Sequence, residues 1–143
     1  MVASVIETVA KYFYFLSQDE NVTHAISFRV FEDLRRHDWL EPGQKNHWIE
    51  VLHKWKGRLP RFHARPWRDQ PREPAFQTPR DFDSLAWRKF LQSGDPGEVE
   101  AVLLSRILLF SDDEIAAGLG VSIGTVRYRV GRGLRHLGGY LET

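Results

Sequence analysis

A stretch near the end of the chain, residues 110–137, constrains the fold more than any other segment. Ser111 can cap a helix while Glu114, three residues later, reaches back to the cap, and this pairing predicts a helix that begins at Ser111. Gly120 suits the left-handed position that ends a helix, and Ser122 can cap a second helix almost at once. Two helix ends this close together predict helices that meet at a steep angle, as in a helix-turn-helix.

The second helix of this pair combines an apolar stripe with a basic face. Val126, Val130, Leu134 and Leu137 recur at helical spacing, and the arginines on the other sides have no carboxylate among their neighbours in sequence. Such a face suits a phosphate backbone, and a bare helix N-terminus at Ser122 would add an anion site; an ordinary solvated helix is the alternative. We predict that the helix binds double-stranded DNA. The predicted contacts are Ser122, Thr125, Arg127, Tyr128, Arg129, Arg132 and Arg135.

Two glycines interrupt the interior of this predicted helix. Gly131 and Gly133 each cost about 1 kcal/mol relative to alanine. Two interpretations are compatible with them: close approach of a neighbouring backbone, or fraying of the last two turns until DNA binds.

The same residues resemble a known family. The run 122–127, followed by Arg129, the Arg-Gly-Leu of 132–134 and Leu137, resembles the C-terminal promoter-reading domain of bacterial sigma factors, above all those of the extracytoplasmic-function group. LuxR-type regulators share only the Glu-Ile-Ala and Gly-Thr-Val portions. The preceding segment is similar too, because Asp95 can cap a helix, Pro96 suits its first position and Glu98 can close a capping box. The resemblance covers residues 87–137 and implies a domain that reads a promoter element.

A proline-rich stretch divides the chain. Five of the seven prolines lie between residues 60 and 79, and they exclude a continuous helix or a central strand there. Residues 54–80 carry eight basic and two acidic side chains, although the formal charge of the whole chain is only +1. We interpret this stretch as a semi-rigid basic linker that follows nucleic acid or an acidic groove; a solvated linker whose aromatic residues dock on the domains is the alternative. The predicted organisation is an N-terminal helical domain (1–59), a linker (60–82) and a helix-turn-helix domain (83–143).

The N-terminal half is helical by pattern. Apolar residues recur at helical spacing from Val5 to Leu16 and again over 22–37, and Asn46 is placed to cap a third helix over 47–56. Three helices would enclose a small core. The whole chain is therefore predicted to be all-α, with two small helical domains.

The resemblance to sigma factors continues more faintly in this half. Residues 23–37 are similar to the sigma helix that binds RNA polymerase, which implies polymerase contacts at Phe28, Phe31, Glu32 and Arg35. The following helix is similar to the one that opens the downstream promoter element, which implies nucleic-acid contacts at Lys54, Lys56, Arg58 and Arg61. The chain departs from the family at 24–27, where an acidic residue and a glutamine are usual. Trp48 and Trp55 are candidates either for the core or for trapping an unpaired strand.

Composition excludes several other classes of protein. The chain has no cysteine, so neither disulfides nor thiolate metal sites can hold it together. It has no secretory signal and no apolar run near the roughly 20 residues that span a bilayer, so we expect a cytoplasmic protein without a membrane partner. His47 and His53 point to different faces of one predicted helix, and we expect neither a metal nor a cofactor. Phosphate-binding glycine loops and nucleophile elbows are missing from the sequence, so we expect no catalytic residue and no enzyme.

Three functions are compatible with these patterns. The leading one is a sigma-like initiation factor that joins the RNA polymerase core through its N-terminal helices and reads promoter DNA with its C-terminal domain. The second is a stand-alone DNA-binding regulator whose N-terminal domain dimerises or senses a signal, which the unusual residues 23–27 favour. The third is an adaptor in which the helix-turn-helix packs against a protein partner, as such domains do with an anti-sigma factor.

Overall fold

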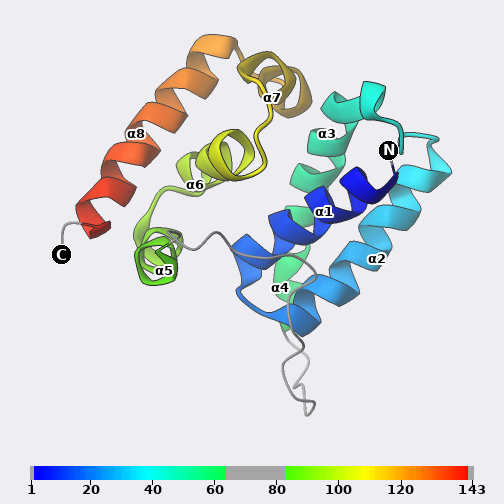
Figure 1. Cartoon of the computed structure of the whole chain (residues 1–143), viewed down its shortest axis with the longest axis horizontal. Helices are drawn as coiled ribbons and strands as arrows, with labels where there is room; N and C mark the ends of the chain where they lie inside the picture. Colours follow the sequence, from blue (N-terminus) through cyan, green and yellow to red (C-terminus); the bar gives the residue numbers. More distant parts are fainter. Residues whose placement is uncertain (1, 64–82, 142–143) are drawn as a thin grey trace. The chain divides into compact units, whose positions relative to one another are not determined.

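The computed structural model describes residues 2–63 and 83–141 and divides the chain into two compact units, Met1–Gln77 and Thr78–Thr143 (Figure 1). Every regular element within the described residues is helical, which confirms the predicted all-α class. Most of the predicted linker, residues 64–82, lies outside the described residues.

Unit 1 is built on a helical hairpin. Helix α1 (Val2–Ser17) and helix α2 (Glu20–Arg36) pack against each other, and the side chain of Asp19 caps α2 by accepting hydrogen bonds from the amides of Asn21 and Val22. A 3₁₀ turn, η1 (Pro42–Gln44), leads into α3 (Lys45–Lys56), and the short α4 (Leu59–His63) follows. Apolar side chains from the three long helices form the core, including Val9, Phe13, Ile26, Leu34, Trp48 and Leu52.

Two local predictions for unit 1 need correction. Asn46 does not cap α3, which begins at Lys45 after Gln44 and has no side-chain cap hydrogen bond. The reason is that η1 runs directly into α3, so the chain is already helical when it reaches Asn46. In addition, residues 60–63 of the predicted linker belong to α4, where Pro60 stands in the first turn and its missing amide costs no intrahelical hydrogen bond.

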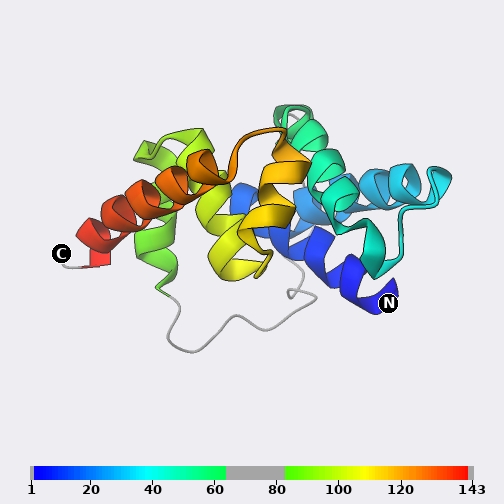
Figure 2. The ribbon, with the colours of Figure 1, turned by 90° about the horizontal axis from the view of Figure 1, so that it is seen from above.

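Unit 2 packs three helices around its last helix, and a π-helical turn extends the second of the three. The elements are α5 (Ser84–Ser93), α6 (Pro96–Val102), the π-helical turn η2 (Leu103–Ile107), α7 (Asp112–Leu119) and α8 (Ile123–Leu141). Helix α8, orange to red in Figure 2, packs against α5, α6 and α7. The core between them includes Trp87, Phe90, Val102, Leu104, Ile115 and Val126.

Gly133 explains how α8 and α6 come so close. A Cβ atom at this position would lie 2.6 Å from Val102 Cγ2 and 3.1 Å from the Glu98 carbonyl oxygen, whereas a Cβ at Gly131 would meet no atom within 4 Å. Close backbone approach is therefore the correct interpretation for Gly133. It does not apply to Gly131.

Candidate DNA-binding site

The turn between α7 and α8 has the geometry that the sequence predicts. Ser111 Oγ accepts a hydrogen bond from the Glu114 amide at 3.1 Å, and Glu114 Oε1 accepts one from the Ser111 amide at 2.9 Å, which completes the capping box. Gly120 ends α7 in the left-handed region, with φ of 68°. The Val121 amide then donates to the Ala116 carbonyl at 3.1 Å. Both ends of α7 are thus closed by local contacts, and the turn places the start of α8 directly after it.

The start of α8 is capped rather than bare. Ser122 Oγ accepts a hydrogen bond from the Thr125 amide at 3.1 Å, and the two hydroxyls are 2.8 Å apart. The predicted cap is confirmed, and the Ser122 side chain occupies one of the first-turn amides, that of Thr125. An anion at this end of the helix would compete with that contact.

The predicted DNA contacts lie along one helix, and most of them are exposed. The side chain of Arg127 is 71% exposed and that of Arg132 is 48% exposed, while Tyr128 is 62% exposed. Ser122 and Arg135 are also exposed, whereas Thr125 and Arg129 are half-buried. On the side that packs into unit 2, Val126 and Val130 are buried. We call the exposed and half-buried set the α8 face (Ser122, Thr125, Arg127, Tyr128, Arg129, Arg132 and Arg135).

The α8 face is basic but not free of acids, which corrects the interpretation from sequence. Arg127 Nε lies 3.1 Å from Asp112 Oδ2 on α7, and Arg132 Nε lies 3.1 Å from Glu98 Oε2 on α6. These carboxylates are distant in sequence and are brought in by helix packing. Asp95 caps α6 through the Glu98 amide at 3.1 Å, as predicted, but the Glu98 side chain faces α8 instead of closing a capping box.

Lys54, near the end of α3, pairs with a buried carboxylate of α2. Asp33 on α2 is 4% exposed; its Oδ2 accepts a hydrogen bond from Trp55 Nε1 at 2.8 Å and pairs with Lys54 Nζ at 3.1 Å. The guanidinium of Arg58 lies over the Trp55 ring, 4.6 Å from its centroid. Burial acts to raise the pKa of Asp33, but the contacts with Trp55, Lys54 and His37 outweigh it, so the pKa is lowered. Lys54 therefore has a structural partner in unit 1.

Other members of this predicted nucleic-acid set differ in exposure. Arg58 and Arg61 are exposed, and Lys56 is half-buried. Trp48 is 1% exposed and donates its indole N–H to the Trp39 carbonyl, so it belongs to the core rather than to a strand-trapping surface. Trp55 is half-buried.

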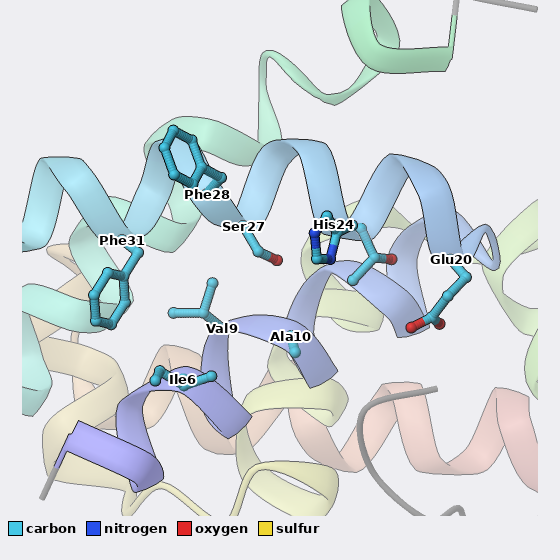
Figure 3. A pocket seen from close by; sticks show the side chains of 9 residues that line it. Ile6, Val9, Ala10, Glu20, His24, Ser27, Phe28 and Phe31 are labelled. Carbon is cyan, nitrogen blue, oxygen red and sulfur yellow. The ribbon is translucent and has the colours of Figure 1, made fainter. Parts of the chain in front are cut away.

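The predicted polymerase contacts lie on α2 beside an apolar groove that sequence reasoning missed. Phe28 is 63% exposed, Arg35 is exposed, and Phe31 and Glu32 are half-buried. Phe28 and Phe31 line the groove with Ile6 and Val9 of α1 (Figure 3), and its volume is about 320 Å³. The one signal in the sequence is Ile6, which falls outside the Val5–Val9 stripe and is 50% exposed. We call this feature the α1–α2 groove.

The described residues hold neither a candidate metal site nor a helix that could span a membrane. Across residues 2–63 and 83–141, no three His, Asp or Glu side chains gather in a way that could hold a metal ion. Within the same residues, every helix is too short or too polar to cross a bilayer.

Comparison with known proteins relates the helix-turn-helix to a known family. No curated protein and no solved structure matches the chain. Residues 95–137 match the family model described as sigma-70, region 4, a family whose members bind promoter DNA and RNA polymerase. The match begins at the cap of α6, includes the whole α8 face, and leaves unit 1 outside. The C-terminal helix-turn-helix of this chain is therefore similar to sigma-70 region 4.

Proposed function

We propose that this chain is a sigma-factor-like transcription factor that reads a promoter element with α8 and recruits RNA polymerase through unit 1. One observation carries the first part: a region 4 match coincides with a helix-turn-helix whose second helix exposes arginine and tyrosine side chains. A face of this composition suits both phosphates and base edges.

The geometry supports a division of roles along the α8 face. In our proposal the N-terminal part of α8 enters the major groove, with Arg127 and Tyr128 at base edges, and α7 crosses the backbone. Thr125, Arg129 and Arg132 contact phosphates, with Ser122 and Arg135 at the two ends of the footprint. Asp112 holds Arg127 beside the turn, from which the guanidinium can reach a base.

Binding to selected DNA tests this division. A duplex selected from a random pool by the full chain is compared with a random duplex by fluorescence anisotropy over a range of salt concentrations. Arg127→Ala should lose about 1–3 kcal/mol of discrimination between the two duplexes, whereas Arg132→Ala should weaken both alike and lower the salt slope by about one. Arg88→Ala, which removes an exposed arginine of α5, is the matched control for charge. Indistinguishable effects of the Arg127 and Arg132 substitutions would contradict the assignment.

Recruitment of polymerase is the second part of the proposal. The α1–α2 groove and the exposed ring of Phe28 offer an apolar surface that a protein partner could cover, and Glu32 and Arg35 follow on the same helix. We expect the full chain to co-elute with core RNA polymerase and to direct transcription from a defined start site. Phe28→Ala should weaken co-elution, whereas Arg36→Ala, at an exposed position of the same helix, should not. Specific DNA binding without co-elution would contradict the recruitment of polymerase and would leave the proposed reading of DNA intact.

A stand-alone regulator is the second candidate function. Sigma factors usually carry an acidic residue and a glutamine within the segment that corresponds to residues 24–27, and His24 and Ser27 of this segment line the α1–α2 groove. A groove changed in this way could serve dimerisation or sensing instead of polymerase binding. A chain that binds its selected duplex as a dimer and ignores polymerase would favour this candidate. A chain that binds neither DNA nor polymerase would favour the adaptor, with an anti-sigma factor as partner.

A further inference from the structure

Glu98 of α6 is a buried carboxylate that contacts side chains of α8. The residue is 6% exposed, and its two oxygens have different partners on α8. Oε1 lies 2.9 Å from His136 Nδ1, and Oε2 lies 3.1 Å from Arg132 Nε. Because a buried carboxylate is costly unless it is paired and hydrogen-bonded, these contacts define where Arg132 lies.

The backbone packing of unit 2 builds this contact. Arg132 and His136 are four residues apart, so they lie on the same side of α8. Gly133, next to Arg132, lets α8 approach so closely that a Cβ there would be 3.1 Å from the Glu98 carbonyl oxygen. Both partners can therefore reach a single carboxylate on α6.

Arg132 is also anchored on its outer side. Its Nη1 donates to the Tyr128 hydroxyl, with 3.4 Å between the two atoms, and the ring of Tyr128 is itself exposed. A guanidinium has five N–H donors; the Tyr128 hydroxyl accepts from one of them, and Glu98 pairs with the Nε edge by charge. The side chain is thus held at two edges and still has donors to offer. Such a side chain loses less conformational freedom when it binds an anion than a free one does.

We propose that Glu98 is a positioning residue for DNA binding. It holds Arg132 against Tyr128, so that the remaining N–H groups of the guanidinium can donate hydrogen bonds to a phosphate. This inference rests on the proposed function of α8. Electrostatics alone predicts the opposite effect, because the loss of a negative charge near a polyanion should raise affinity. The sign of the effect of removing Glu98 therefore distinguishes positioning from simple charge.

Glu98→Gln tests the proposal because it keeps the shape of the side chain and removes its charge. We expect its affinity for the selected and the random duplex to fall by about three- to tenfold, with a salt slope lowered by about one. Asp113→Asn removes an exposed charge of the same unit and should leave both affinities unchanged or slightly higher. A Glu98→Gln protein that binds as tightly as the wild type, or more tightly, would overturn the proposal.

A double-mutant cycle and a DNA-free measurement keep the test decisive if Glu98→Gln loosens the fold. In the Arg132→Ala background nothing remains to be positioned, so adding Glu98→Gln should no longer weaken binding. Continued loss there would mean that Glu98 acts through the fold, and the proposal would fail. In the free protein, the Arg132 Nε–H resonance should change its chemical shift in Glu98→Gln, because its charged neighbour is lost; an unchanged resonance would count against positioning.

The failure of this inference can be told apart from the failure of the proposed function. A wild-type chain that binds no selected duplex refutes the proposed reading of DNA. A wild-type chain that binds its duplex, beside a Glu98→Gln chain that binds equally well, refutes only the positioning role.

Discussion

At the scale of single residues, Asp33 organises the polar contacts of unit 1. Its carboxylate joins α2 to α3 through Trp55 and Lys54, and Asp33 Oδ1 lies 3.2 Å from His37 Nδ1. His37 stacks on Trp39, which in turn stacks on His47. One buried carboxylate thus ties the end of α2, the connection to α3 and α3 itself together.

The lowered pKa of Asp33 predicts an acid-sensitive unit 1. A pKa that is lower in the folded protein than its ordinary value of 3.8 means that the ionised side chain stabilises the fold above that value. This stabilisation is lost as the pH falls through 3.8 toward the pKa of the folded protein. We expect Asp33→Asn to lower the unfolding free energy by about 1.5–3 kcal/mol at neutral pH. Below about pH 5, the unfolding free energy of the variant should fall less steeply with pH than that of the wild type.

Urea unfolding between neutral and acid pH measures this effect, with hydrogen exchange in α2 and α3 as the reporter for unit 1. Asp38→Asn is the matched control, because Asp38 is exposed and has φ of 61°, a conformation that asparagine tolerates. If the unfolding free energy of Asp33→Asn fell with pH as steeply as that of the wild type, a group other than Asp33 would cause the acid sensitivity.

Two capping serines allow stability and DNA binding to be separated. Ser111 and Ser122 each accept a hydrogen bond from an amide three residues later. Replacing either with alanine should lower the unfolding free energy by about 1 kcal/mol. Only Ser122→Ala should also reduce affinity for the selected duplex, because Ser122 lies on the α8 face. Thermal unfolding and anisotropy measure the two properties, and equal losses of affinity would argue against a DNA contact at Ser122.

At the scale of the elements, the closeness of α6 and α8 depends on one glycine. Gly133→Ala would place a methyl group against Val102 and the Glu98 backbone, neither of which is the flexible end of a long side chain. We expect it to lower the unfolding free energy by about 1–3 kcal/mol in spite of the better helix propensity of alanine. Gly131→Ala, two residues away in open space, should instead raise it by about 0.5–1 kcal/mol. Chemical denaturation of both variants measures the contrast, and effects of the same sign would contradict this packing.

The same elements show what could be predicted from the sequence and what could not. The capping box at Ser111 and the left-handed Gly120 depend on neighbours within four residues, so their residue types alone predict the turn. The partners of Arg127 and Arg132 come from other helices, 15 and 34 residues away, and only the packing of α8 reveals them. The predicted cap at Asn46 was wrong for a related reason: the preceding 3₁₀ turn makes the chain helical before it reaches Asn46.

The α1–α2 groove illustrates the same limit for a surface. Its lining comes from two helices that are each amphipathic in sequence, and periodicity assigns a buried side to each of them. Whether a hollow remains between them depends on the sizes of the side chains that meet there. The exposed Phe28 and Ile6 show that the two apolar sides do not cover each other completely.

At the scale of the whole molecule, the two units have separate cores, each assembled from its own helices. DNA bound to unit 2 should therefore stabilise that unit without stabilising unit 1. At a free concentration of the selected duplex 100 times its Kd, the expected gain is about 2.7 kcal/mol, which is roughly a hundredfold greater protection of the slowest amides. Hydrogen exchange of the full chain should show this gain in α6 and α8, whereas the amides of α1 and α2 should keep their rates. A random duplex at the same concentration should give a smaller gain, and an equal gain in both units would mean that they unfold as one.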